Sequence, residues 1–139
     1  MIILDTNVLS DAMLPTPDPA VLAWLDRQPR ISIWTSSLTV LEIRFGLALL
    51  PQGRQRTRLE EEFERTLSET IEDRVLAFEL AAAEETAELM AARQRIGRPM
   101  ELRDAMIAGI AIARHATLAT RNTRHFTDLP IPVVNPWTG

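Results

Sequence analysis

The chain has 139 residues, 46% of them hydrophobic and 24% charged, and a formal net charge of −4. This length predicts one domain over residues 1–139. It has no cysteine and no lysine, which excludes thiolate metal sites, iron–sulfur clusters, Walker phosphate loops and Schiff-base enzymes.

Apolar runs and helical periodicity predict strands and helices in alternation. In chain order they are a strand at 2–4, a short helix at 8–13, a helix from 19 to about 28, a strand at 31–34, a helix at 38–50, a charged helix at 54–74, a strand at 75–78, helices at 79–96 and 101–114, and strands at 117–120 and 131–134. Helix caps are predicted at Asp18, just before Pro19, and within 35–37. Strands separated by helices indicate an α/β fold with a mostly parallel sheet.

Asp5 directly follows the first predicted strand. Open α/β sheets build their binding sites at the carboxyl ends of strands, so Asp5 is a candidate functional acid. A purely structural role is the alternative, because Asp5 or Asn7 would also suit the cap of the next helix.

Glu42 is predicted to lie on an apolar helix face formed by Leu38, Leu41, Phe45 and Leu49. A glutamate on a buried face needs a partner. No arginine stands at the helical spacing that would supply one. We therefore expect Glu42 to meet either an arginine distant in sequence or a metal ion.

Asp104 lies in the first turn of a helix whose next nine residues, 105–113, carry no charge. Such a helix should be buried on nearly all sides. An acid in the first turn also stabilises the positive end of the helix dipole by about 0.3–1 kcal/mol, which is the structural alternative.

Taken together, the three acids predict a cation site if the fold brings them to the same strand ends. Carboxylates that lie close together repel unless a cation intervenes. Oxygen ligands without histidine or cysteine favour Mg²⁺ or Mn²⁺. Such ions serve phosphodiester cleavage, because they activate water and neutralise charge on the phosphate.

Several segments carry a family resemblance. They are ILDTNVLS at 3–10, LTVLEIRFG at 38–46, RDAMIA at 103–108, ATRN at 119–122 and VNPW at 134–137. In this order and spacing they resemble PIN-domain nucleases, especially the VapC/FitB-type toxins of bacterial toxin–antitoxin pairs. The resemblance covers essentially the whole chain.

The resemblance implies a three-layer α/β/α sandwich and an endoribonuclease that depends on Mg²⁺ or Mn²⁺. Asp5, Glu42 and Asp104 would be the catalytic and metal-binding acids. Asn122 stands where the family often has a fourth acid, and an amide is a weaker ligand. The expected products carry a 5′-phosphate and a 3′-hydroxyl. The supporting or substrate-contacting residues would be Thr6, which helps to orient Asp5 or water, Thr120, Arg121 and Arg124.

The resemblance also implies partners. They are an RNA substrate, a small cognate antitoxin, a second toxin subunit in a homodimer, and operator DNA reached only through the antitoxin. The charged helix at 54–74 offers Leu59 and Phe63 as one contact surface. No apolar stretch is long enough to span a membrane and no signal peptide is recognisable, so we expect a cytoplasmic protein.

Other functions fit less well. A haloacid-type phosphatase needs a second aspartate where this chain has Asn7, and it needs a lysine, as does a phospho-receiver domain. The remaining alternative is a PIN-like binding module that is weakly active or inactive. Asn122 favours that alternative, and the three intact acids oppose it.

Overall fold

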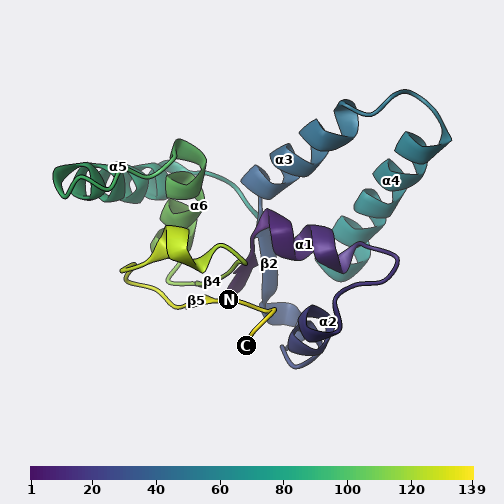
Figure 1. The fold of residues 1–139 in the computed structure, drawn as a ribbon, viewed down its shortest axis with the longest axis horizontal. Helices are drawn as coiled ribbons and strands as arrows, with labels where there is room; N and C mark the ends of the chain where they lie inside the picture. Colours follow the sequence, from purple (N-terminus) through teal and green to yellow (C-terminus); the bar gives the residue numbers. More distant parts are fainter.

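The computed structural model describes residues 1–139 and has a central sheet of five strands in the order β3-β2-β1-β4-β5 (Figure 1). The strands are β1 Ile2–Leu4, β2 Ile33–Ser36, β3 Val75–Leu76, β4 Thr117–Ala119 and β5 Val133–Val134. Every neighbouring pair is parallel, and Ile3 of β1 lies opposite Trp34 of β2 and Leu118 of β4. The predicted α/β fold with a parallel sheet is confirmed.

Six α-helices connect and cover these strands. They are α1 Thr6–Ala12, α2 Pro19–Asp26, α3 Ser37–Ala48, α4 Arg54–Arg65, α5 Leu80–Arg95 and α6 Leu102–Ala113. Two predicted caps are confirmed, because the Asp18 side chain accepts from the Ala20 N–H at 2.9 Å and Ser36 from the Thr39 N–H at 3.3 Å. None of the helices is both long and apolar enough to cross a bilayer.

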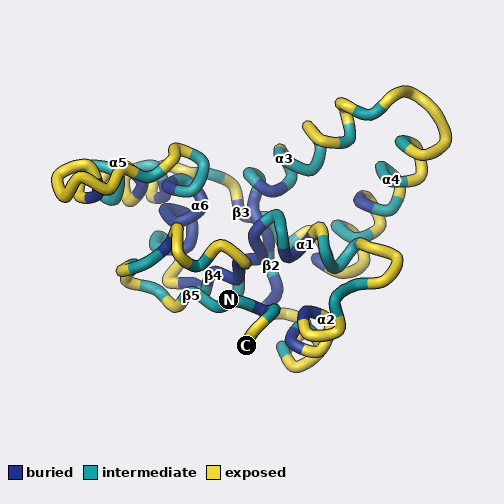
Figure 2. The backbone as a smooth tube through the Cα atoms, viewed as in Figure 1, coloured by how far each residue is buried: buried dark blue, intermediate teal, exposed yellow.

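Side chains that alternate along the strands feed two separate cores, one on each face of the sheet. Figure 2 shows that the central strands and much of α6 are buried. Ile3 and Leu118 point into the core beneath α5 and α6. Leu4 and Ala119, the next residues along the same strands, point into the core on the side of α1 to α4. This arrangement explains why the strands read as continuous apolar runs rather than as alternating ones.

Helix α6 is buried on most sides, as its uncharged sequence predicts. It packs closely on α5 at Gly109, where the Thr86 hydroxyl donates to the carbonyls of Ala82 at 2.7 Å and Ala105 at 3.2 Å. A Cβ atom at Gly109 would lie 2.7 Å from the Ala82 carbonyl oxygen and would also collide with Thr86. The small residue therefore sets the distance between these two helices, and it places the first turn of α6 over the sheet.

Several predicted boundaries are wrong, and the third and last strands, Val75–Leu76 and Val133–Val134, are shorter than the predicted 75–78 and 131–134. The second strand begins at Ile33 instead of Ile31, because 30–32 form a 3₁₀ turn in which Ile31 is exposed. The short helix after β1 begins at Thr6 instead of Val8, since Asp5 serves as its cap. The charged helix ends at Arg65 and continues as a π-helical turn, Thr66–Thr70, followed by left-handed residues at 72 and 73.

The predicted buried face of α3 is also wrong. Leu41, Phe45 and Leu49 are 63%, 64% and 70% exposed, although Leu38 does pack against the core beneath α5 and α6. The residues that pack against the other core are instead Val40, Ile43 and Leu47. Helix α3 carries apolar residues on two sides with the same spacing, and it projects from the sheet together with α4 (Figure 1).

Phe63 of α4 is fully buried, so it belongs to the core and is not available to contact a partner. The Arg44 guanidinium lies 5.1 Å from the centre of its ring. The predicted contact surface at Leu59 and Phe63 is therefore incorrect for Phe63.

We predict that Gly109→Ala lowers the free energy of unfolding by about 1–3 kcal/mol, because the added methyl group forces α5 and α6 apart. Urea denaturation measures the change. Gly46→Ala is the matched control, since no atom lies within 4 Å of its Cβ position on the exposed side of α3. The control should raise stability by about 0.5–1 kcal/mol through helix propensity. Equal effects of the two substitutions would contradict the close packing.

Candidate functional site

Asp5 and Thr120 lie at the carboxyl ends of the neighbouring strands β1 and β4. The Asp5 side chain is only 2% exposed. Its Oδ2 atom accepts a hydrogen bond from the Thr120 hydroxyl at 2.8 Å, and its Oδ1 atom accepts from the Thr6 N–H at 2.8 Å. Asp5 thus caps α1. Its carboxylate also lies between β1 and β4, the point from which the chain adds strands in opposite directions, and parallel sheets usually build their binding sites at such a point.

Glu42 reaches the same place from α3. The Thr6 hydroxyl donates to its Oε1 atom at 2.9 Å and lies 3.2 Å from the Thr39 hydroxyl. The Glu42 side chain is 35% exposed, so this carboxylate is the most accessible of the three predicted acids. Thr6 therefore connects the end of β1 with the second turn of α3.

Asp104 comes from the first turn of α6, and its side chain is 14% exposed. Its Oδ2 atom lies 3.3 Å from Nδ1 of His125, which belongs to the 3₁₀ helix Thr123–Phe126 after β4. We call Asp5, Glu42 and Asp104 the acid triad. The fold brings its members together from three distant segments.

One arginine lies at the centre of the acid triad. Nη2 of Arg103 is 2.6 Å from Asp5 Oδ1, and Nη1 is 3.2 Å from Asp104 Oδ1. Nε of Arg103 pairs with Glu42 Oε1, and Nη2 also donates to the Thr6 hydroxyl at 2.9 Å. The partner that Glu42 was predicted to need is thus an arginine distant in sequence.

The electrostatics of Arg103 follow from this position. Burial is the largest single influence on its pKa and lowers it, because a buried guanidinium loses hydration. The charges of Asp5 and Glu42, with the hydrogen bonds they accept, together outweigh burial and raise the pKa above its ordinary value. Arg103 is therefore a permanent cation that neutralises part of the acid triad's charge.

The donor chemistry of the acid triad fits a hard divalent cation, because three carboxylates converge on one positive group. The arrangement itself is not that of a metal centre, and no group of three acids or histidines is placed to ligate an ion. The Arg103 guanidinium lies where their oxygen atoms point. An ion can therefore use these ligands only if Arg103 moves.

The other predicted residues differ in how close they come to the acid triad. Thr6 and Thr120 contact Asp5 directly. Asn122 is exposed, and its backbone N–H donates to Thr120 Oγ1 at 3.1 Å while its side chain makes no hydrogen bond. No hydrogen bond therefore joins the Asn122 amide group to the acids.

The two arginines predicted at the rim lie apart. The Arg121 guanidinium lies 4.8 Å from the centre of the Trp137 ring, and the backbone N–H of Arg121 donates to Asn7 Oδ1 at 3.2 Å. Arg124 is exposed and lines a pocket that Asp104 also lines. Of these two arginines, Arg124 therefore shares a pocket with a member of the acid triad, Asp104.

Sequence reasoning missed Arg103 and His125 as members of the site. A signal existed for Arg103, since a cation in the first turn of a helix opposes the helix dipole and needs an acidic partner. The sequence left a distant arginine open as the partner of Glu42 but did not identify Arg103, because the two residues are 61 positions apart. No comparable signal marked His125.

Comparison with known proteins finds relatives along nearly the whole chain. The sequence profile of the PIN domain matches residues 2–131. The chain is 40% identical over 137 residues to VapC ribonuclease Y4jK of Sinorhizobium fredii, covering 99% of this chain and 98% of that protein. It is 35% identical over 137 residues to Toxin FitB of Neisseria gonorrhoeae, covering 99% of each. A chain in the solved structure of FitAB bound to a DNA fragment is similar with a TM-score of 0.89 at 35% identity, covering 99% of this chain and 96% of that one.

We predict that Arg103→Gln lowers the free energy of unfolding by about 2 kcal/mol, because it leaves the buried Asp5 charge without its cation. The exposed Arg58, which makes no ion pair, gives the control Arg58→Gln, with an expected change within about 0.5 kcal/mol. Adding Asp5→Asn to Arg103→Gln should recover much of the loss. Additive losses in the double variant would contradict the pairing.

Proposed function

This chain belongs to the PIN-domain family, and we therefore propose that it is an endoribonuclease that requires Mg²⁺ or Mn²⁺ and acts as the toxin of a toxin–antitoxin pair. One observation carries the proposal. Three carboxylates from different segments meet at the carboxyl ends of parallel strands, and Arg103 is the only cation that pairs with all three. The relative named as a VapC ribonuclease supports RNA as the substrate.

The acid triad would hold the ion after the Arg103 guanidinium has moved aside. A bound divalent ion would activate water and neutralise charge on the scissile phosphate. Asn122 would add no charge to the site, and its side chain makes no hydrogen bond to the three acids. The proposal therefore relies on Asp5, Glu42 and Asp104 alone as charged ligands.

The three acids would have different tasks. Asp5 is buried and already accepts hydrogen bonds at both oxygen atoms, so it suits holding an ion and not moving a proton. Glu42 is the most exposed acid and is oriented by the Thr6 hydroxyl, so we assign to it the proton of the attacking water. Attack on phosphorus with loss of the 3′ oxygen would leave a 5′-phosphate and a 3′-hydroxyl.

An antitoxin would explain an otherwise unpartnered feature of the surface. Leu41, Phe45 and Leu49 form an exposed apolar stripe along α3. Exposed stripes of this kind mark contact surfaces for other proteins. The similarity to a chain of FitAB bound to DNA supports a two-protein assembly in which the antitoxin contacts the operator. A toxin homodimer within that assembly is part of the same proposal.

We predict that the purified chain cuts single-stranded or structured RNA in Mg²⁺ or Mn²⁺ and that EDTA abolishes cutting. Glu42→Gln should lower the rate by about 10²–10⁴-fold, because it removes the group that takes the proton. Asp5→Asn should abolish cutting. Glu84→Gln, an exposed acid of α5 without an ion pair, is the control and should cut normally.

Gel analysis of labelled RNA measures cutting, and mapping the cut ends tests the predicted products. Equal cutting in EDTA would contradict the metal requirement. Unchanged cutting by Asp5→Asn would place the activity elsewhere. A chain that binds Mn²⁺ but cuts no RNA would favour the inactive binding module, and Asn122→Asp would then test whether the missing fourth acid is the reason.

We also predict that Mn²⁺ raises the melting temperature more for Arg103→Gln than for the unsubstituted chain. In the variant no guanidinium competes for the acid triad, so the folded state should bind the ion more tightly. Differential scanning fluorimetry with and without Mn²⁺ measures the shift. Arg58→Gln should respond like the unsubstituted chain. A smaller shift for Arg103→Gln than for that control would mean that the ion does not bind where Arg103 lies.

A further inference from the structure

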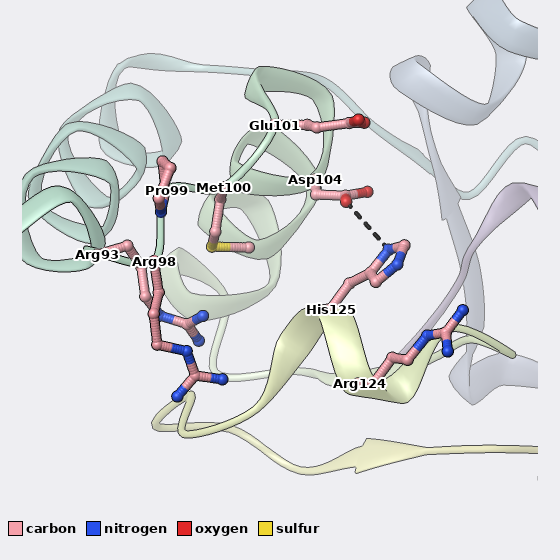
Figure 3. Close-up of a pocket in the computed structure, with 8 residues that line it drawn as sticks. All are labelled: Arg93, Arg98, Pro99, Met100, Glu101, Asp104, Arg124 and His125. Carbon is pink, nitrogen blue, oxygen red and sulfur yellow. Dashed lines mark ion pairs between the residues drawn. The ribbon is translucent and has the colours of Figure 1, made fainter. Parts of the chain in front are cut away.

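A basic pocket lies next to the acid triad, because Asp104 also lines this pocket (Figure 3). Its volume is about 250 Å³, and its lining includes Arg93 and Arg98 near the end of α5, Arg124 and His125 of the 3₁₀ helix, and Asp104 itself. Segments distant in sequence therefore supply one concave surface with three arginines. We call it the arginine pocket.

The three arginines of this pocket make no ion pair, as is true of several other arginines of the chain, but they are the ones that line a common pocket. Arg30, Arg44, Arg56, Arg74 and Arg103 each pair with a carboxylate. Glu101 also lines the pocket, but it pairs with none of them. The pocket thus holds positive charge that the protein leaves unneutralised.

Arg93 is the strongest indication that an anion belongs here. It is 8% exposed, and Arg residues are almost never buried to this extent without a partner. Its only hydrogen bond is donated from Nη2 to the Thr127 carbonyl. A guanidinium has five N–H donors, so most of those on Arg93 have no acceptor within the protein, and they are open to solvent at the pocket instead of being enclosed by the protein.

Two properties of the arginine pocket indicate which anion it takes. Its volume is below the roughly 300 Å³ at which small-molecule pockets begin, so it suits a single charged group better than a whole cofactor. Guanidinium groups match the geometry of phosphate oxygen atoms. In Figure 3, Arg93 and Arg98 extend along one side of the pocket, while His125 faces Asp104 on the other. A phosphate in the pocket would lie beside the acid triad.

We propose that the arginine pocket binds an RNA backbone phosphate that flanks the scissile one, so that it positions the substrate strand across the acid triad. This inference rests on the proposed ribonuclease function, whose substrate it helps to hold. Arg93 and Arg98 supply the binding charge, and Arg124 extends it along the rim. An acidic protein then holds RNA through a local patch of positive charge.

The test measures RNA binding in EDTA, where cutting does not interfere. The probe is a short fluorescein-labelled single-stranded RNA, and the readout is fluorescence anisotropy over a series of salt concentrations. Arg98→Gln should weaken binding about ten-fold, as expected for the loss of one charged hydrogen bond. It should also lower the slope of log K against log salt by about 0.7, the value for one phosphate contact on a single strand.

Arg95→Gln is the matched control. Arg95 is the last residue of α5, three positions before Arg98, makes no ion pair and does not line the arginine pocket. It should change neither the affinity nor the salt slope. Because Arg93 is buried and its loss could disturb folding, Arg93→Lys serves as the second variant, which keeps the charge but loses the planar fork. It should weaken binding without a large change in melting temperature.

The outcomes separate this inference from the proposed function. If the Arg98→Gln variant binds and cuts RNA as the Arg95→Gln variant does, the arginine pocket has no role in RNA binding, and the ribonuclease proposal still stands. RNA binding that depends on Arg98 in a chain that never cuts RNA supports the pocket and overturns the ribonuclease proposal. Weaker binding of a polyglutamate peptide by Arg98→Gln, with RNA binding unchanged, assigns the pocket to a protein carboxylate and overturns the inference.

Kinetics give an independent readout if the chain cuts RNA. A flanking phosphate contact is made equally in the ground and transition states, so Arg98→Gln should raise KM and leave kcat unchanged. A fall in kcat at constant KM would place Arg98 in the chemical step and would overturn a role limited to positioning.

Discussion

The negative charge of Asp5 is the constraint on which the site depends. A carboxylate buried at the end of a central strand must be met by donors or cations, because it has lost its hydration. Its partners are the Thr6 N–H, the Thr120 hydroxyl and the Arg103 guanidinium. They come from α1, the end of β4 and α6, so satisfying one charge fixes how three segments of the chain meet.

The same constraint links stability with the proposed activity. Arg103 neutralises the acid triad in the resting structure, and a catalytic ion would have to neutralise it during cleavage. Under the proposal both cations would require the same oxygen atoms and would exclude one another. The proposed chemistry would then have to break a contact that stabilises the fold, and the balance between guanidinium and ion would set how readily the site becomes active.

Charge is divided between two neighbouring surfaces. The acid triad gathers negative charge around one arginine, while Arg93, Arg98 and Arg124 gather unpaired positive charge in the arginine pocket. Asp104 belongs to both surfaces and is thus the point at which they meet. A net charge of −4 says little about such a site, since phosphate recognition depends on the local arrangement of charge.

The sequence by itself determined the features that depend on neighbours a few residues away. These were the strand before Asp5, the caps at Asp18 and Ser36 and the burial of α6. It did not determine which apolar side of α3 is buried, because two stripes have the same spacing and only the position of the sheet distinguishes them. Nor did it reveal Arg103 as the partner of Glu42. Tertiary structure decided both, because helical periodicity relates residues only within one helix, whereas burial and ion pairing depend on which distant segments the sheet brings together.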